Sequence, residues 1–342
     1  MRRRELITLD RIGARSMVLR RSVILAFAAM SLLSREVFSQ AEFKARRVGL
    51  LSSGAPLTDT SDVVIGVSAG FSKRGYVVGS SLFFQRRAAE GFPDRLPGLV
   101  DDLKNQAELI ITNSYAAAHV VKDRSNIPVV AITGADPVAT GLIDSLAHPG
   151  GNITGVGEVA ADLSAKRLEI FKDAFPNLRK IAMLWNADDL GMTLRFKSAE
   201  GAARTLGFEI QPLGVREPED FAAAFDAMAR DRPDAILMVT DALTSLNRKR
   251  VFEFAAQQKL PAIYEYAFLV RDGGLMSYGP DMDEVYDRAA DLAVRILRGA
   301  RPADLPFEQP THFRLAINKK TLEALGLTIP GAMLMRADEV VD

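Results

Sequence analysis

The chain repeats one strand–helix pattern twice, at a nearly constant offset. Val48-Gly-Leu-Leu corresponds to Ile181-Ala-Met-Leu 133 residues later. Gly75-Tyr-Val-Val corresponds to Gly207-Phe-Glu-Ile 132 residues later, and the segment from Asn126 has its counterpart at an offset of 133. Any two α/β segments share some similarity, but three matches at a nearly constant offset predict two lobes of the same construction.

Short apolar runs rich in valine, isoleucine and leucine predict buried strands. These runs are Val48 to Leu51, Leu109 to Ile111, Ile127 to Ile132, Ile181 to Trp185 and Ala235 to Val239. Amphipathic segments separate them, and one of these begins at Glu217-Pro218 and repeats apolar residues at Phe221 and Phe225. Regular alternation of strand and helix predicts an α/β fold with two doubly wound parallel-sheet lobes.

Two such lobes predict a ligand cleft. In open α/β sheets the ligand lies beyond the carboxyl ends of the strands, so two lobes facing each other across these ends would enclose it. Polar and aromatic residues follow the predicted strands in both halves. The candidate ligand-binding residues are Ser52, Ser53, Asn113, Ser114, Tyr115, Asp136, Trp185, Asn186, Asp241 and Tyr264.

These residue types suit a small polar ligand. Hydroxyls and backbone N–H groups at helix starts suit a carboxylate, and acids suit an ammonium group. The rings of Tyr115, Trp185 and Tyr264 could stack on a flat ligand. Structural roles are the alternative, because Ser53 and Ser114 are good helix caps and Trp185 ends an apolar strand where it could be core.

Asp241 is the preferred partner for a ligand ammonium, and Asp136 is the second choice. Asp241 follows an apolar strand and precedes a helix predicted to start near Ser245, so capping is less natural for it. Asp136 precedes a proline and is both a turn former and a good cap.

Composition and motifs argue against several other chemistries. There is no cysteine, and the three histidines have no H-x-x-x-H or H-E-x-x-H spacing, so no metal site is expected. The sequence contains neither a G-x-x-x-x-G-K-[ST] phosphate loop nor a G-x-S-x-G nucleophile elbow. We expect no catalytic residues, no cofactor and no enzyme activity.

The N-terminus has the pattern of a secretory signal peptide. Seven arginines between Arg2 and Arg21 precede an eleven-residue apolar run, Val23 to Leu33. This run is too short to cross a bilayer, which needs about 20 apolar residues, but it suits a signal-peptide core. Cleavage is plausible after Ser39 or Ala41. A membrane anchor or a buried helix is the alternative, and Arg20-Arg21 hints only weakly at a twin-arginine signal.

Removing residues 1–41 changes the net charge of the chain. This segment has eight arginines and three acids, whereas the whole chain has 43 basic and 43 acidic residues. The remainder therefore has 35 basic and 40 acidic residues, a net charge of −5. Binding to a phosphate backbone needs a basic surface, so nucleic acid is not an expected partner.

Three separated stretches carry motifs in a fixed order: ADPVATGLIDSLAHPGGNITGV at Ala135 to Val156, GGLMSYGP at Gly273 to Pro280, and PADLPFEQPTHFRLAINKKTLEALGLTIP at Pro302 to Pro330. They resemble the substrate-binding proteins of bacterial ABC importers, in the family whose better-studied members bind tryptophan or tyrosine. The turn formers of the first stretch predict a loop, a short helix and another turn. Asn113-Ser114-Tyr115 stands where relatives more often have small Gly or Thr residues, so no particular ligand is carried over.

The resemblance implies a type I periplasmic binding protein with hinge strands between its lobes. Gly155-Val156-Gly157 and the run from Met276 to Gly279 look like two of the crossings, and the helix from Asp283 to Arg298 is expected to return to the first lobe. The expected domains are a signal peptide at 1–41, a first lobe at 46–157 with about 280–300, and a second lobe at 158–279 with 301–342.

The implied function is that of the periplasmic component of an ABC importer. It would capture a small amino-acid-like or carboxylate ligand, close around it and dock on a membrane permease. Two alternatives remain open: a ligand sensor without a transport role, and, with less support, an α/β enzyme.

Overall fold

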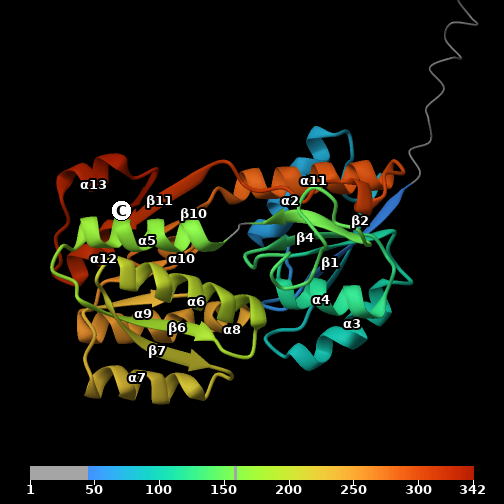
Figure 1. The fold of residues 1–342 in the computed structure, drawn as a ribbon. Coiled ribbons are helices and arrows are strands. Elements are labelled where there is room, and N and C mark those ends of the chain that lie inside the picture. Colours follow the sequence, from blue (N-terminus) through green and yellow to red (C-terminus); the bar gives the residue numbers. More distant parts are fainter. Residues whose placement is uncertain (1–44, 158–159) are drawn as a thin grey trace, which may run out of the picture. The chain divides into compact units, whose positions relative to one another are not determined.

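The computed structural model describes residues 45–157 and 160–342, and the predicted signal peptide lies outside them (Figure 1). The first sheet has five parallel strands in the order β2-β1-β3-β4-β5. Their bounds are β1 (Arg46–Ser52), β2 (Leu82–Ala88), β3 (Leu109–Thr112), β4 (Val129–Thr133) and β5 (Ile153–Gly157).

The second sheet has seven strands in the order β12-β11-β10-β9-β8-β6-β7. They are β6 (Lys180–Asn186), β7 (Glu209–Val215), β8 (Ala235–Met238), β9 (Ala262–Tyr264), β10 (Met276–Pro280), β11 (Phe313–Asn318) and β12 (Glu339–Val341). The order β7-β6-β8-β9-β10 repeats that of the first sheet, which confirms the predicted pair of doubly wound lobes. β11 then joins β10 in the antiparallel direction, and β12 lies parallel to β11.

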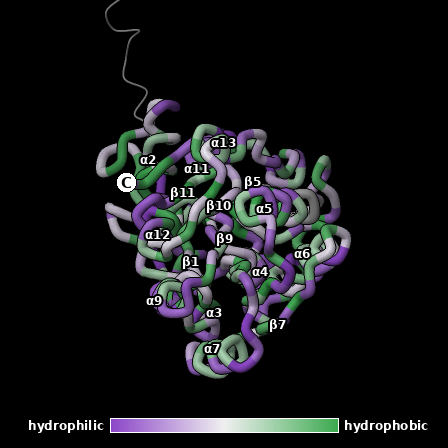
Figure 2. The backbone as a smooth tube through the Cα atoms, turned by 90° about the vertical axis from the view of Figure 1, so that its left-hand side faces the viewer, coloured by the Kyte–Doolittle hydropathy of each residue, from purple (hydrophilic) through white to green (hydrophobic). Residues whose placement is uncertain are grey.

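Helices cover these sheets. They are α2 (Asp62–Lys73), α3 (Leu96–Leu103), α4 (Tyr115–Arg124), α5 (Ala160–Ala174), α6 (Leu190–Thr205), α7 (Asp220–Arg230), α8 (Ala242–Leu246), α9 (Arg248–Gln258), α10 (Ala267–Arg271), α11 (Met282–Leu297), α12 (Lys319–Ala324) and α13 (Gly331–Arg336), with short 3₁₀ turns at Pro93–Arg95 and Pro302–Asp304. The helix α9 is largely hydrophilic (Figure 2) and buries only Val251, Phe254 and Ala255. Within the described residues, none of the helices combines the length and the apolar character that crossing a bilayer requires.

Alternate residues of the central strands pack on opposite faces of the first sheet. In β4, Val129 and Ala131 belong to the hydrophobic core that includes α3 and α4. Val130 and Ile132 belong to a second core, which contains residues of α2 and α11. A strand sends successive side chains to opposite faces, so the continuous apolar run of β4 is what a strand covered on both faces requires.

The helix α11 follows β10 of the second sheet but packs in the core of the first lobe, beside α2 (Figure 1). Glycines in α2 allow the close approach: a methyl group at Gly70 would lie 2.6 Å from Cβ of Ala290. Arg74 then forms ion pairs with Asp287 at 3.0 Å and Asp291 at 2.9 Å. The boundaries given above for the two lobes stay a prediction.

The segment from Ala135 to Val156 differs from its prediction, because the described structure has turns there in place of a short helix. The Asp136 carboxylate accepts hydrogen bonds from the backbone N–H groups of Val138 and Ala139. Gly141 adopts a φ of 69°. This left-handed conformation suits glycine and ends the turn before a helix can propagate.

Two glycine-to-alanine changes should affect stability in opposite directions, because Gly70 lies in the contact between α2 and α11 and Gly201 lies in open space. Gly70→Ala should destabilise the protein by about 1 kcal/mol or more, because overpacking costs about 1–3 kcal/mol. Gly201→Ala, in the helix α6 with no neighbour within 4 Å of the added methyl group, should stabilise it by about 0.5–1 kcal/mol through helix propensity. Chemical denaturation measures both changes, and equal effects would contradict the described packing.

Candidate ligand-binding site

The two lobes touch where the strands of the first sheet end. A methyl group at Gly54, just after β1, would lie 3.7 Å from Cβ of Ala242 at the start of α8. A methyl group at Gly134, just after β4, would collide with Nη1 of Arg195 in α6. Residues following β1 and β4 therefore meet helices that follow strands of the second sheet, and the carboxyl ends of both sheets border one region.

A third contact lies at the first turn of α6. A methyl group at Gly191 would be 2.5 Å from Cβ of Ala135 and 3.5 Å from Cδ1 of Tyr115. Both of these neighbours belong to the first lobe, where Ala135 follows β4 and Tyr115 begins α4. The absence of a side chain at Gly191 thus lets α6 approach the strand ends of the first sheet.

Two aspartates cap helices at the strand ends of the second lobe. Oδ1 of Asp189 accepts a hydrogen bond from Met192 N at 3.1 Å, at the start of α6. Oδ1 of Asp241 accepts one from Thr244 N at 2.9 Å, at the start of α8. The helix predicted to start near Ser245 instead begins at Ala242, so the expectation that Asp241 is less suited to capping is wrong. Its side chain and that of Thr244 form a reciprocal capping box.

The second carboxylate oxygen of Asp241 binds another predicted site residue. Oδ2 of Asp241 accepts a hydrogen bond from Nδ2 of Asn186 at 2.6 Å. Asn186 ends β6 and Asp241 follows β8, and these strands are neighbours in the sheet. The structure therefore brings together two polar residues that the sequence places 55 positions apart.

Partial burial makes the charged form of both aspartates less favourable than it is in water. It raises the pKa of Asp189 to about 6, and the nearby charge of Asp241 raises this pKa further. The hydrogen bond from the Met192 N–H group and the charge of Arg195 lower the pKa and only partly offset these effects. Burial also raises the pKa of Asp241, although the Thr244 N–H group and the Asn186 amide oppose it. Two carboxylates that are costly to ionise in one region favour the arrival of a positive group.

Tyr115 and Ser114 lie at the start of α4, as predicted for residues after β3. The Tyr115 side chain is buried, and its ring centroid is 5.6 Å from that of His119. Burial, together with the charge of Asp189, raises the pKa of the Tyr115 hydroxyl. Oγ of Ser114 accepts a hydrogen bond from Ala117 N at 3.2 Å, so Ser114 is a helix cap, while Asn113 beside it is exposed.

Ser52 ends β1, and Ser53 directly follows it. Oγ of Ser52 accepts a hydrogen bond from Gly54 N at 3.0 Å, and the carbonyl oxygen of Ser53 accepts one from Gly91 N at 2.9 Å. Both serines are buried. Ser53 does not cap a helix, because the next helix, α2, begins at Asp62.

Two aromatic candidates pack within the second lobe. The ring of Trp185 stacks on Phe196 of α6 with centroids 3.7 Å apart. Tyr264 is 1% exposed and meets Phe252 edge-on at 5.3 Å, in a hydrophobic core of that lobe. The structure thus places Tyr264 in the core in place of the predicted ligand-stacking role, and the protein itself covers one face of Trp185.

Sequence reasoning missed a buried ion-pair cluster at the end of β9. Oε1 of Glu265 lies 3.2 Å from Nη1 of Arg167 and 2.5 Å from Nη2 of Arg195. Thr240 N donates a hydrogen bond to Oε2 of the same carboxylate at 2.9 Å. Each arginine lies inside a helical segment, where a single charged residue indicates a solvated face, so the sequence carries no local signal for the two arginines. Thr240 and Glu265 directly follow strands, the position at which polar site residues are predicted.

Asp189 was also missed, although a signal for it exists. Like Asp241, it follows an apolar strand and directly precedes a helix, which is the N-cap position. Within residues 45–157 and 160–342, there is no group of three or more histidine, aspartate or glutamate side chains that could hold a metal ion.

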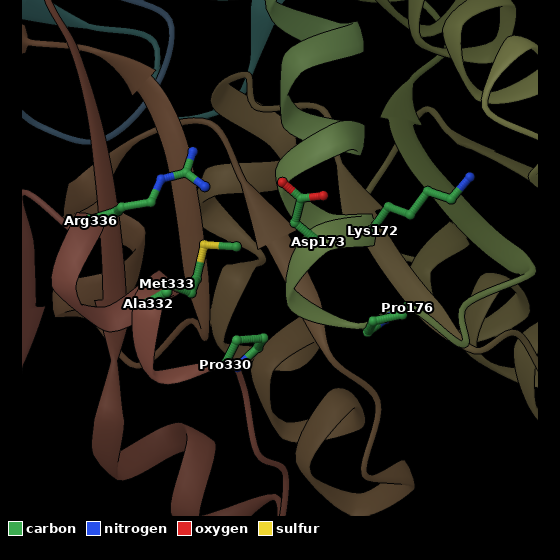
Figure 3. Close-up of a pocket in the computed structure, with 7 residues that line it drawn as sticks. All are labelled: Lys172, Asp173, Pro176, Pro330, Ala332, Met333 and Arg336. Carbon is green, nitrogen blue, oxygen red and sulfur yellow. The ribbon is translucent and has the colours of Figure 1, made fainter.

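A separate pocket of about 460 Å³ lies at the end of α5, next to α13 (Figure 3). Its lining residues are Lys172, Asp173, Pro176, Pro330, Ala332, Met333 and Arg336. The Lys172 side chain points away from Arg336 in this view, and its ammonium donates a hydrogen bond to the Leu206 carbonyl at 2.8 Å. None of the predicted site residues lines this pocket.

Residues 58–341 match the family described as ABC transporter substrate binding protein. The chain belongs to this family. The resemblance inferred from the three sequence motifs is therefore confirmed. A curated relative of this ABC transporter substrate binding protein, the tyrosine-binding protein of Clostridioides difficile, is 28% identical over 229 residues. This match covers 67% of the chain and 65% of the relative, just under two thirds of its length.

This ABC transporter substrate binding protein has the same fold as several solved structures. An ABC domain from Streptococcus pneumoniae in complex with L-Trp has a TM-score of 0.79 at 23% identity, covering 87% of this chain and 100% of that one. A conserved domain protein from Vibrio cholerae has a TM-score of 0.80 at 24% identity, with the same coverage. The predicted two-lobed type I binding-protein fold is confirmed.

Asp189 predicts a pH dependence for the stability of the ligand-free protein. A carboxyl whose pKa rises on folding contributes stability below its unfolded pKa, about 3.9, and this contribution is lost as the pH rises through about 6. Asp189→Asn keeps a good N-cap and removes the charge, so it should flatten this part of the profile. At pH 7.5 the variant should be more stable, by at most about 3 kcal/mol.

Thermal or chemical unfolding between pH 4 and pH 7.5 measures this difference. Asp188→Asn is the matched control, because the Asp188 side chain is 65% exposed and pairs with Arg216 on the same lobe. It should retain the wild-type profile. Parallel profiles for Asp189→Asn and wild type would show that the folded protein does not penalise the Asp189 charge.

Proposed function

We propose that this ABC transporter substrate binding protein captures a small amino-acid-like ligand between its lobes and delivers it to a membrane permease. The observation that carries the proposal is the pair of half-buried, helix-capping carboxylates, Asp189 and Asp241, at the strand ends of the second lobe. Strand ends are where open α/β sheets bind ligands. The name of the tyrosine-binding relative and the L-Trp bound to the pneumococcal protein support an amino-acid ligand.

Hydrogen bonds from a ligand ammonium would compensate for the hydration that these carboxylates lose when the protein folds. Oδ1 of Asp241 already accepts a hydrogen bond from the Thr244 N–H group, and Oδ2 accepts one from the Asn186 amide. The carboxylate is therefore oriented before the ligand arrives. Charge-assisted hydrogen bonds to such a fixed acceptor are worth about 1.5–3 kcal/mol. Tyr115, at the start of α4, lies 3.5 Å from where a methyl group on Gly191 would be, next to the helix start that Asp189 caps. It would contact the remainder of the ligand, together with the neighbouring Asn113 and Ser114.

Asp241→Asn tests the ammonium contact. The change keeps the cap, since asparagine caps as well as aspartate, but it removes the charge. Affinity for an amino-acid ligand should fall about tenfold or more, because each 1.4 kcal/mol is a factor of ten. The stability of the empty protein should not fall.

Calorimetric titration measures the affinity, after a thermal-shift screen of amino acids, aromatic acids and small osmolytes has found a ligand. Asp188→Asn, with its exposed carboxylate in the loop before α6, is the control and should bind like wild type. Unchanged affinity in Asp241→Asn would mean that the ligand has no ammonium group at this carboxylate. A large loss of stability without ligand would show that the charge of Asp241 is structural.

We further propose that the protein works in the periplasm after its leader is removed. The arginine-rich segment before the apolar run from Val23 to Leu33 supports export. Mass spectrometry of the periplasmic protein should find an N-terminus near Gln40 or Glu42. Recovery of the uncleaved chain from the cytoplasm alone would exclude this localisation.

A further inference from the structure

The side chain of Tyr115 occupies space between the two lobes. It is only 6% exposed, although it belongs to the first residue of a helix at a strand end. Its Cδ1 atom faces the first turn of α6, 3.5 Å from where a methyl group on Gly191 would lie. A residue of the first lobe is thus buried against a helix start of the second.

Tyr115 is also the only aromatic residue among those that follow β1, β3 and β4 in the first lobe. The others are Ser52, Ser53, Gly54, Asn113, Ser114, Thr133, Gly134, Ala135 and Asp136. All of these except Asn113 are small or have short side chains, and Asn113 itself is exposed. Tyr115 therefore contributes the largest buried side chain from this side of the site.

The ring lies close to the carboxylates that carry the proposed function. A methyl group placed on Gly191 would lie 3.1 Å from Oδ1 of Asp189 and 3.5 Å from Cδ1 of Tyr115, so this carboxylate and the ring flank the same point. Asp189 in turn interacts with Asp241. A ligand with its ammonium at these acids would have Tyr115 next to it, so the volume open to the rest of the ligand is limited by this ring.

We propose that Tyr115 sets an upper limit on ligand size, so that the site accepts short aliphatic or hydroxylated amino acids and rejects aromatic ones. This inference rests on the proposed function, because it assumes that the ligand ammonium binds at Asp189 and Asp241. The physical basis is packing: a protein interior has no spare volume for a second ring where Tyr115 already fills the space. Tyr115 is thus a specificity-determining residue.

The test compares two sets of ligands by calorimetric titration of the exported protein. One set contains glycine, L-alanine, L-serine and L-threonine, and the other L-phenylalanine, L-tyrosine and L-tryptophan. Wild type should bind at least one member of the first set and bind the second at least tenfold more weakly. Tyr115→Ala should shift the affinity ratio of the two sets at least tenfold in favour of the aromatic ligands.

Three further variants serve as a replacement for Tyr115→Ala and as controls. Tyr115→Leu also removes the ring but fills more of the core, so it replaces Tyr115→Ala if that variant does not fold. Tyr115→Phe keeps the ring and should keep the wild-type preference. His119→Ala removes a half-exposed neighbour on the same helix and should also keep it. A changed preference in either control would overturn the assignment to ring volume.

The outcomes separate this inference from the proposed function. Tight binding of an aromatic amino acid by wild type, lost in Asp241→Asn, would support the proposed function and overturn the size limit. An unchanged ratio in both Tyr115→Ala and Tyr115→Leu would also overturn the size limit. If no amino acid binds the folded wild-type protein, the proposed function itself fails, and the size limit fails with it.

Discussion

The arrangement of the second lobe depends on one buried carboxylate, Glu265. It is 2% exposed, and a buried charge is stable only when it is paired and hydrogen-bonded. The guanidinium groups of Arg167 and Arg195, together with the Thr240 N–H group, supply these partners. Since Arg167 belongs to α5, Arg195 to α6 and Thr240 follows β8, this single side chain fixes three segments around the end of β9.

The cluster also connects the sheet to the candidate ligand site. Nε of Arg167 donates a hydrogen bond to the carbonyl oxygen of Tyr278 in β10, at 2.6 Å. Arg195 extends from α6, which Asp189 caps and whose first turn contains Gly191, to Gly134 of the first lobe. The position of the α6 N-terminus relative to the strand ends is therefore set by a charge pair. Breaking such a buried pair by removing one partner costs several kcal/mol, so the site and the lobe are stable together.

The energetics of the two carboxylates support the proposal that the site captures a cation. Asp189 and Asp241 lose part of their hydration because they are half-buried, and the hydrogen bonds from their own helix starts replace only part of it. These bonds nevertheless hold both carboxylates in one orientation, so little additional ordering is needed when a ligand binds. Fixed acceptors of this kind improve affinity because the entropic cost of arranging them is met during folding.

The sequence by itself determined the two-lobed α/β fold and the identity of several strand-end residues. Strand and helix periodicity are local, and parallel strands place their carboxyl ends at one edge, so Asn186 and Asp241 could be assigned to the same edge before any coordinates. The side chains that pack against that edge come from distant parts of the sequence. Only the tertiary structure showed that Tyr264 is core, that Trp185 stacks on Phe196, and that Arg167 and Arg195 are buried on Glu265. The burial and charge pairing of these side chains depend on which helices cover the strand ends, and distant parts of the chain set that packing.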